Sequence, residues 1–180
     1  MEQIERTMKS DKIFDGKVLS LRVDTVELPD KKYSKREIVE HDPAVAVVAA
    51  DNDGNILLVK QYRKPVEKVI YEIPAGSIEI GENPREGAIR ELKEETGYVA
   101  KDVEYISEFY STPGFCTEKM YIFFATEIEE CDQEPDEDEF IEVEKVSLDK
   151  AIKMIQLGEI MDAKSIIGIL MYEKYKKGEK

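Results

Sequence analysis

Apolar and polar residues alternate along two stretches near the N-terminus, residues 17–28 and 35–41. A period of two is typical of strands that bury one face. Pro29 and Asp30, which lie between the two stretches, favour a turn. The pattern predicts short antiparallel strands within residues 13–42. We therefore expect a small N-terminal sheet in residues 1–42 and a larger unit in residues 43–180.

The next part of the chain has longer apolar runs. Residues 44–50 are continuously apolar, residues 51–55 (DNDGN) have turn composition, and residues 56–63 (ILLVKQYR) begin with another apolar run. This arrangement predicts a buried hairpin in a mixed sheet. Further strands are predicted within residues 103–115, 119–128 and 140–147, of which the first two are joined by a Pro-Gly turn.

Helix signals are present at both ends of residues 84–96. Asn83 is a suitable N-cap, Pro84 suits the first helical position, and Gly97 ends the pattern. Apolar residues recur at helical spacing again near the C-terminus, in residues 148–157 and 163–175. The chain thus mixes strands with a few helices.

Composition narrows the class of protein. The 180 residues suit one domain with a modest appendage, and 42% of them are hydrophobic, which is enough for a packed core. There are 40 acidic residues against 26 basic ones, a net charge of -14. A nucleic-acid partner is not expected, because such a protein needs a clustered basic face. An anionic substrate would need metal ions or a few placed arginines.

The same composition indicates a cytoplasmic protein without a membrane segment. Cys116 and Cys131 are too few for a disulfide framework, and the charged N-terminus lacks the apolar core of a signal peptide. No apolar run reaches the ~18 residues of a membrane span. His41 is the only histidine, which leaves carboxylates as the abundant candidates for acid, base and ligand roles.

Glutamates gather on the helix predicted for residues 84–96. Glu91 and Glu95 share one face, with Glu94 beside them. Arg90 can pair with Glu94, but one arginine does not neutralise the cluster, so a divalent cation is the natural partner. Carboxylate oxygens suit Mg²⁺ or Mn²⁺. The alternative, for an isolated glutamate-rich helix, is an ordinary solvated face.

The spacing around this helix resembles the Nudix box. The sequence GSIEIGENPREGAIRELKEETGY, residues 76–98, fills the fixed positions of that pattern and departs from it only at Tyr98, where the family more often has an aliphatic residue. The resemblance implies the Nudix fold, an α/β (α+β) arrangement with a mixed sheet sandwiched between helices. It also implies hydrolysis of a nucleoside diphosphate linked to another group.

The resemblance further implies a role for each residue of the box. Glu91 and Glu95 would ligate the divalent ion, and Glu94 would join them directly or through water. The backbone carbonyl of Ala75 would complete the site, and Arg90 would orient the glutamates. The remaining fixed positions have supporting roles: Glu82 would buttress the loop or reach the metal through water, and Gly76 and Gly97 are expected to have positive φ angles.

A second resemblance concerns the substrate. Pro113 in YSTPGF lies fifteen positions beyond Tyr98 (113 minus 98), similar to the placement that marks the ADP-ribose pyrophosphatases. An ordinary Pro-Gly turn is the alternative. The segments KREIVEH, LLVKQYRKP, YEIPAG and DEDEFIEV also look like those of that subfamily. The implied reaction converts ADP-ribose to AMP and ribose 5-phosphate.

This subfamily resemblance nominates further residues. Arg63 and Arg36 would contact phosphate and ribose, and Glu72 would contact the substrate, although surface arginines and a strand end are the plain alternatives. Glu137 or Glu139, in an acidic loop, would be the general base; a merely solvated loop is the alternative.

The N-terminal segment 1–42 is implied to make a homodimer and to contribute to substrate binding. An isolated small sheet is only marginally stable, which agrees with that role. Two other functions stay open at this point: a pyrophosphatase for another nucleoside diphosphate sugar or a dinucleotide, and a non-catalytic Nudix module that senses a nucleotide. The intact set of acidic residues disfavours the second.

Overall fold

The computed structural model describes residues 3–135 and 139–178. The chain divides into two compact units. We call Met1–Pro43 with Tyr110–Lys119 the N-terminal unit, and Ala44–Phe109 with Met120–Lys180 the core unit. The segment Tyr110–Lys119 thus belongs with the N-terminal sheet, although it lies outside residues 1–42 in sequence.

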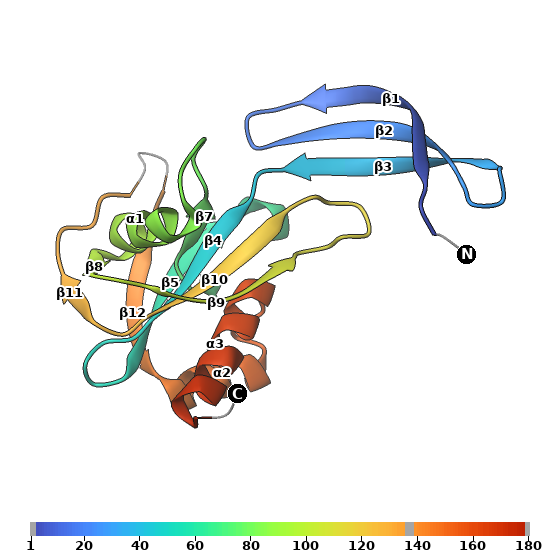
Figure 1. Ribbon diagram of the computed structural model, residues 1–180. Coiled ribbons are helices and arrows are strands. Elements are labelled where there is room, and N and C mark those ends of the chain that lie inside the picture. The colour runs from blue at the N-terminus through green and yellow to red at the C-terminus, as the bar shows by residue number, and fades with distance from the viewer. Residues whose placement is uncertain (1–2, 136–138, 179–180) are drawn as a thin grey trace. The chain divides into compact units, whose positions relative to one another are not determined.

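The N-terminal unit is a three-stranded antiparallel sheet in the order β1-β2-β3 (Figure 1). Its strands are β1 (Arg6–Asp15), β2 (Leu19–Glu27) and β3 (Tyr33–His41). The sequence pattern predicts β2 and β3, which the structure confirms, but it misses most of β1. The register of β1 shifts between Thr7 and Lys9 and between Lys12 and Phe14, and such bulges interrupt the alternation on which a strand prediction depends.

Strand β3 of the N-terminal unit is joined to the segment Tyr110–Lys119 through backbone hydrogen bonds. The Val39 N–H donates to the Phe115 carbonyl at 2.8 Å, and the Thr117 N–H donates to the Val39 carbonyl at 3.0 Å. The Thr117 hydroxyl also accepts from the His41 N–H at 3.0 Å. The loop that carries Pro113 is therefore fastened along β3.

Among its described residues, the core unit contains three sheets, three α-helices and one short 3₁₀ helix. The sheet orders are β7-β4-β10-β9, β12-β5-β6 and β11-β8. The strands are β4 (Ala44–Ala49), β5 (Asn55–Arg63), β6 (Lys68–Glu72), β7 (Ala75–Ser77), β8 (Tyr98–Ala100), β9 (Glu104–Tyr110), β10 (Lys119–Ala125), β11 (Ile128–Glu130) and β12 (Glu142–Ser147). The helices are η1 (Lys64–Val66), α1 (Pro84–Thr96), α2 (Leu148–Leu157) and α3 (Ala163–Lys176).

The hairpin predicted over residues 44–63 is wrong. β4 pairs in parallel with β10 and antiparallel with β7, whereas β5 pairs with β6 and β12. Only the bridge between Ala50 and Ile56 joins the two strands across the turn. All of β4 and the first apolar part of β5, Ile56 to Val59, are buried, and such runs do not indicate which neighbours they will pair with.

The α1 prediction is confirmed at both ends. The Asn83 side chain accepts a hydrogen bond from the Arg85 N–H at 2.9 Å, and Gly97 ends the helix in the left-handed conformation with φ 69°. The two C-terminal helices are also confirmed, and Ser147 and Asp162 cap them. Within the described residues, no helix is long and apolar enough to cross a membrane.

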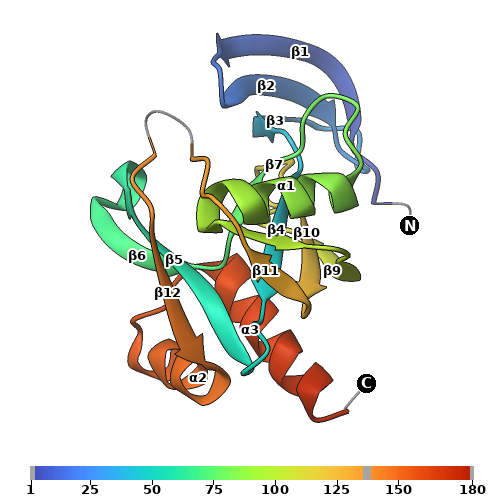
Figure 2. The same cartoon turned by 90° about the vertical axis from the view of Figure 1, so that its left-hand side faces the viewer.

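The core unit is layered, as the sequence pattern predicts. Alternate residues of β4 face opposite sides: Ala46 and Val48 join a core cluster that includes residues of α2 and α3, while Val45 and Val47 join one that includes Leu92 of α1. Figure 2 shows α1 on one side of these strands and α3 on the other. The mixed sheet between helices positions α1 against β4, β5 and β7.

Candidate active site

The C-terminal half of α1 brings Glu95 against the strand β7. Its side chain is almost fully buried, with 3% of the residue exposed. The Ala75 N–H donates a hydrogen bond to Glu95 Oε2 at 2.8 Å, and the Gln133 amide donates to the Glu95 carbonyl at 2.6 Å. Strand β7 and the loop after β11 are therefore both hydrogen-bonded to Glu95, near the C-terminal end of α1.

Arg90 lies at the centre of the acidic cluster. Its Nε and Nη2 donate to the two carboxylate oxygens of Glu82 at 2.9 and 3.0 Å. Its Nη1 donates to Glu91 and Glu94, both at 2.8 Å, and Nη2 also donates to the Ser77 carbonyl at 3.0 Å. Glu82 in turn accepts from the Glu79 N–H at 2.9 Å, so it ties the loop to the helix.

The two glycines of the motif serve different physical purposes. Gly97 has φ 69°, as predicted. Gly76 is not among the residues with positive φ, so that expectation is wrong. A Cβ at position 76 would instead overlap the carboxyl group of Glu91. Glycine is required there because a side chain of α1 passes directly over the backbone of β7.

Burial and like charges perturb the two inner carboxyl groups. Burial, together with the charges of Glu91 and Glu139, raises the pKa of Glu95 to about 8, against the opposing effects of the Ala75 N–H and Arg63. Burial also raises the pKa of Glu91 above its usual value, although Arg90 opposes that shift. A divalent cation at these oxygens would relieve both costs.

The oxygen ligands available for a hard divalent ion are fewer than the sequence predicts. Glu91 and Glu94 both accept hydrogen bonds from Arg90, and among the described residues no three His, Cys, Asp or Glu side chains are grouped closely enough to hold a metal. Mg²⁺, however, keeps several waters and binds through one or two carboxylates together with substrate phosphates. Glu91, Glu95 and the Ala75 carbonyl oxygen match that smaller requirement.

A second charged group lies beside the glutamates. Arg63 Nε and Nη2 donate to Glu72 at 2.6 and 3.0 Å, and Lys164 of α3 also pairs with Glu72. Lys164 Nζ lies 3.1 Å from Asp162. The positive charge of Arg63 opposes the rise in the pKa of Glu95, so the guanidinium lies within electrostatic range of that carboxyl group. Sequence reasoning nominated Arg63 and Glu72 but missed Lys164, because its contact crosses 92 positions of sequence.

This buried group leads to a prediction about acid stability. Burial raises the pKa of Glu72, but the Arg63 hydrogen bond and the charge of Lys164 more than offset it, so the pKa lies below its usual 4.5. Such a carboxyl contributes stability above its unfolded pKa, and the contribution is lost as the pH falls through the lower folded pKa. We expect Glu72→Gln to lower the unfolding midpoint at about pH 7 and to differ less from wild type as the pH falls below about 4.

Thermal unfolding of both proteins across this pH range measures the effect. Glu142→Gln is the matched control, because Glu142 also pairs with a cation, Lys60, but its side chain is 72% exposed. An exposed pair contributes little. A difference between wild type and Glu72→Gln that does not change with pH would contradict the prediction.

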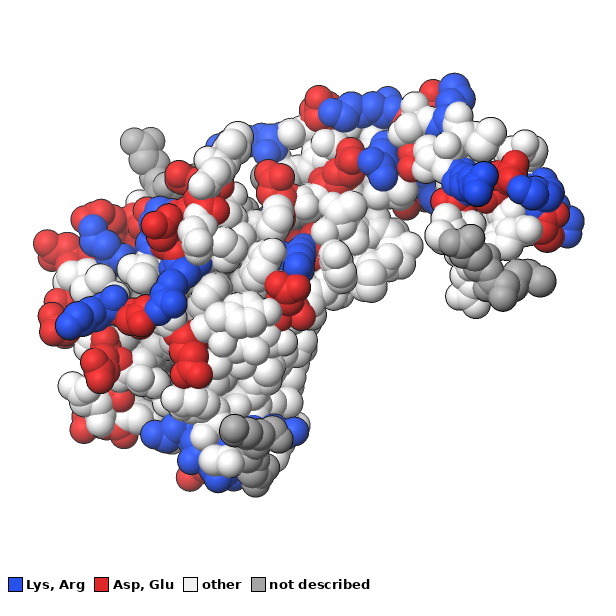
Figure 3. Space-filling model, viewed as in Figure 1, with Lys and Arg blue, Asp and Glu red and all other residues white. Residues whose placement is uncertain are grey.

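The other nominated residues are distributed as follows. Arg36 and Pro113 lie in the N-terminal unit, where Arg36 pairs with Glu5 at 2.5 Å. Glu139 belongs to the core unit, and its charge acts on both Glu91 and Glu95. Glu137 lies outside the described residues. Acidic side chains gather, with lysines and arginines among them, over the region of α1, β8 and β11 (Figure 3).

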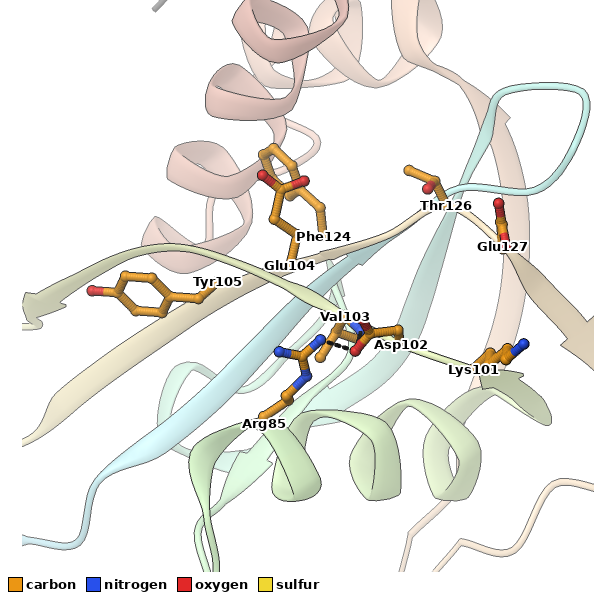
Figure 4. Close-up of a pocket in the computed structure, with 9 residues that line it drawn as sticks. All are labelled: Arg85, Lys101, Asp102, Val103, Glu104, Tyr105, Phe124, Thr126 and Glu127. Carbon is orange, nitrogen blue, oxygen red and sulfur yellow. Dashed lines mark hydrogen bonds and ion pairs between the residues drawn. The ribbon is translucent and has the colours of Figure 1, made fainter.

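A separate hollow of about 760 Å³ opens near the start of α1. In Figure 4, Arg85 and Asp102 point toward one another across it and form an ion pair. Its lining mixes charges of both signs, with Lys101, Glu104 and Glu127 among the residues. The residues that line the hollow do not include Glu91, Glu94 or Glu95, so it is separate from the candidate active site. It also lacks the uniform positive lining that would favour a phosphate.

Comparisons with known proteins identify the family of the chain. A family model described as "NUDIX domain" matches residues 40–165, so the chain belongs to the Nudix family. It is 50% identical over 167 residues to the ADP-ribose pyrophosphatase of Bacillus subtilis (strain 168), a match that covers 92% of this chain and 90% of that protein. It is 46% identical over 167 residues to the "Methanol dehydrogenase activator" of Bacillus methanolicus, with the same coverage.

The fold has a close match among solved structures. A crystal structure described as that of an ADP compounds hydrolase superposes with a TM-score of 0.88 at 21% identity, and the match covers 98% of this chain and 96% of that one. The predicted Nudix fold, a mixed sheet between helices with an N-terminal antiparallel sheet, is thereby confirmed.

Proposed function

We propose that this protein hydrolyses the pyrophosphate bond of ADP-ribose and releases AMP and ribose 5-phosphate. The observation that carries the proposal is the 50% identity to an ADP-ribose pyrophosphatase over nearly the whole chain. Glu91 and Glu95 of α1, together with Arg63, would supply the chemistry that the reaction needs. Water adds across the P–O–P linkage, so one phosphate gains the hydroxyl and the other leaves with the bridging oxygen.

The roles of the site residues follow from their positions. Glu91, Glu95 and the Ala75 carbonyl oxygen would hold Mg²⁺ or Mn²⁺, and Glu94 would contribute through water. When bound, such an ion lowers the pKa of a water and absorbs charge that develops on the phosphate. Arg90 would keep the carboxylates of Glu91 and Glu94 in place through its hydrogen bonds.

The remaining residues bind the substrate and accept the proton. Arg63, oriented by its two bonds to Glu72, would grip a phosphate oxygen. Glu139, whose charge already acts on the glutamate cluster, or Glu137 would accept the proton from the attacking water. Arg36 and Pro113 would contact the ribose and adenosine part.

We also propose that the N-terminal unit forms a homodimer and contributes Arg36 and Pro113 to the site. Every residue of β1 is exposed, and large apolar side chains such as Met8, Ile13 and Phe14 are more than half exposed. Exposed apolar groups on a sheet without a core of its own mark an interface. These residues would be covered by a second copy of the chain.

Replacing Ile13 with Lys is expected to shift the protein from dimer to monomer, because a charge would be buried in the interface. Light scattering coupled to size-exclusion chromatography measures the mass directly. Val66→Lys is the control, because Val66 is 54% exposed in the core unit against 60% for Ile13. A wild type that is monomeric, or a dimeric Ile13→Lys, would refute the dimer.

Turnover of ADP-ribose tests the proposed function. The assay compares ADP-ribose with other nucleoside diphosphate sugars and with dinucleotides, in Mg²⁺, in Mn²⁺ and in chelator. We expect metal-dependent release of AMP with preference for ADP-ribose. Preference for another substrate would support pyrophosphate hydrolysis but refute ADP-ribose as the substrate. No turnover of any substrate would favour a nucleotide sensor.

The relative from Bacillus methanolicus supports a second candidate function. Its name describes an activator of methanol dehydrogenase, and it is 46% identical to this chain. Adding wild type and a turnover-deficient variant to an alcohol dehydrogenase assay separates the possibilities. Activation by both proteins would indicate a binding role, and activation by wild type alone would indicate that hydrolysis is required.

A further inference from the structure

Gln61 of β5 has a buried amide group without a partner. The residue is 8% exposed, and its Nε2 has no hydrogen-bond partner among the described residues. The other two such atoms in the described chain, Arg22 Nε and Asp24 Oδ1, belong to two side chains that form an ion pair at 3.4 Å in the N-terminal unit. Gln61 has no comparable explanation. Buried donors are normally paired, so an unpaired one requires a reason.

The direction of the Gln61 side chain follows from the alternation along β5. Leu57 belongs to the core cluster that includes Ala88 and Leu92 of α1. Because side chains two apart in a strand share a face, Gln61 lies on the same face as Leu57 and points toward the α1 side. Arg63, two residues further on, shares this face.

The surroundings of that face belong to the candidate active site. The positive charge of Arg63 acts on Glu95, and the charge of Glu139 acts on Glu95 as well. Glu72, which holds Arg63, is the register partner of Val59 on the same face. The unpaired Gln61 donor therefore lies on the same strand face as Arg63, whose positive charge acts on Glu95.

We propose that the Gln61 amide donates a hydrogen bond to a phosphate oxygen of the nucleoside diphosphate substrate. This inference rests on the proposed function and assigns a further substrate-binding residue within it. A bound pyrophosphate supplies the acceptor that the protein itself does not. Arg63 and Gln61, which are two residues apart on the same face of β5, would then both donate hydrogen bonds to the same anionic group.

The proposal predicts opposite effects of one substitution on stability and on binding. Gln61→Met keeps the length of the side chain but removes the unpaired donor, so the unfolding midpoint without ligand should stay the same or rise. The affinity for substrate should fall about 10- to 100-fold, because a hydrogen bond to a charged group is lost. If Gln61 were only a buried core residue, Gln61→Met would change neither the affinity for substrate nor the KM.

The experiment measures binding of α,β-methylene ADP-ribose, which cannot be hydrolysed at the bridge, by calorimetry in Mg²⁺. Thermal unfolding without ligand and the KM for ADP-ribose accompany it. Gln156→Met, the same change at an exposed position of α2, is the control and should match wild type. Gln61→Glu keeps the shape of the side chain but presents an acceptor to the phosphate, and it should bind more weakly still.

The outcomes separate the two proposals. A wild type that neither binds the analogue nor hydrolyses ADP-ribose overturns the proposed function and the Gln61 contact with it. A wild type that does both, beside Gln61→Met and Gln61→Glu variants of unchanged affinity, overturns the Gln61 contact alone. Weak binding by a Gln61→Met protein that unfolds at or above the wild-type midpoint supports the contact.

Discussion

Glu95→Gln is expected to lower the turnover of ADP-ribose by about 1,000-fold, which corresponds to roughly 4 kcal/mol of lost transition-state stabilisation. The substituted amide still accepts the Ala75 N–H, so the local backbone should keep its position. It does not, however, offer the anionic oxygen that a divalent cation needs. The loss should therefore lie in kcat and in metal affinity, measured by metal-dependent kinetics and by titration with Mn²⁺.

The same substitution is expected to stabilise the metal-free protein. Glu95 is 3% exposed and lies close to the charges of Glu91 and Glu139, so its ionised form is disfavoured in the folded state. A neutral amide removes that cost. Thermal unfolding in chelator should show a higher midpoint for Glu95→Gln than for wild type.

Glu86→Gln is the matched control for both effects, because Glu86 is an exposed residue on the first turn of the same helix. It should change turnover little. If a folded Glu95→Gln protein kept wild-type turnover, the proposal that α1 holds the metal would be refuted. Loss of turnover with loss of the fold would instead show that Glu95 has a structural role.

The local part of the site is predictable from sequence because its residues are close together in the chain. The caps at Asn83 and Gly97 define α1, and helical spacing places Glu91 and Glu95 on one face. The pairing of Arg90 with Glu94 at i,i+4 follows in the same way. These features depend on spacing within one element, which the sequence displays directly.

Other features depend on contacts between distant elements, and the sequence does not display them. Lys164 reaches Glu72 only because the start of α3 packs beside the end of β6. The unpaired amide of Gln61 is recognised only once burial and partners are known. The predicted hairpin is wrong for a related reason, since the pairing of β4 with β10 joins segments about 75 positions apart, as Ala46 and Ile122 show.

The net negative charge of the chain makes the contacts of Arg63 and Lys164 important for binding an anionic substrate. A protein of charge -14 that binds a pyrophosphate must present positive charge locally. Glu72 pairs with Arg63 and Lys164, and Lys164 also pairs with Asp162, so the group contains two cations and two anions. The charge of Arg63 nevertheless acts on Glu95 in the neighbouring site.

Gly76→Ala is expected to lower kcat about 100-fold while it costs only about 1 kcal/mol of stability. The added Cβ would overlap the carboxyl group of Glu91. Because that group is the end of a flexible side chain, it can swing aside and the fold can persist. The carboxyl would then leave Arg90, to which it is held at 2.8 Å, and the metal position with it.

Gly158→Ala, at the end of α2, distinguishes this local displacement from general destabilisation. Gly158 has φ 72° and open space around it, so alanine there should cost a similar amount of stability, about 1 kcal/mol, without touching Glu91. Unfolding midpoints and kcat are measured for both variants. Equal losses of kcat in the two would contradict the displacement of Glu91.

A double variant tests the contact between positions 76 and 91 directly. Glu91→Asp alone should lower kcat, because the shorter side chain falls short of the metal position. In Gly76→Ala/Glu91→Asp the shorter side chain also avoids the new methyl group, so the two losses should not add. The kcat of the double variant should thus be higher than the product of the two single effects implies, and strict additivity would mean that the glycine and the glutamate act independently.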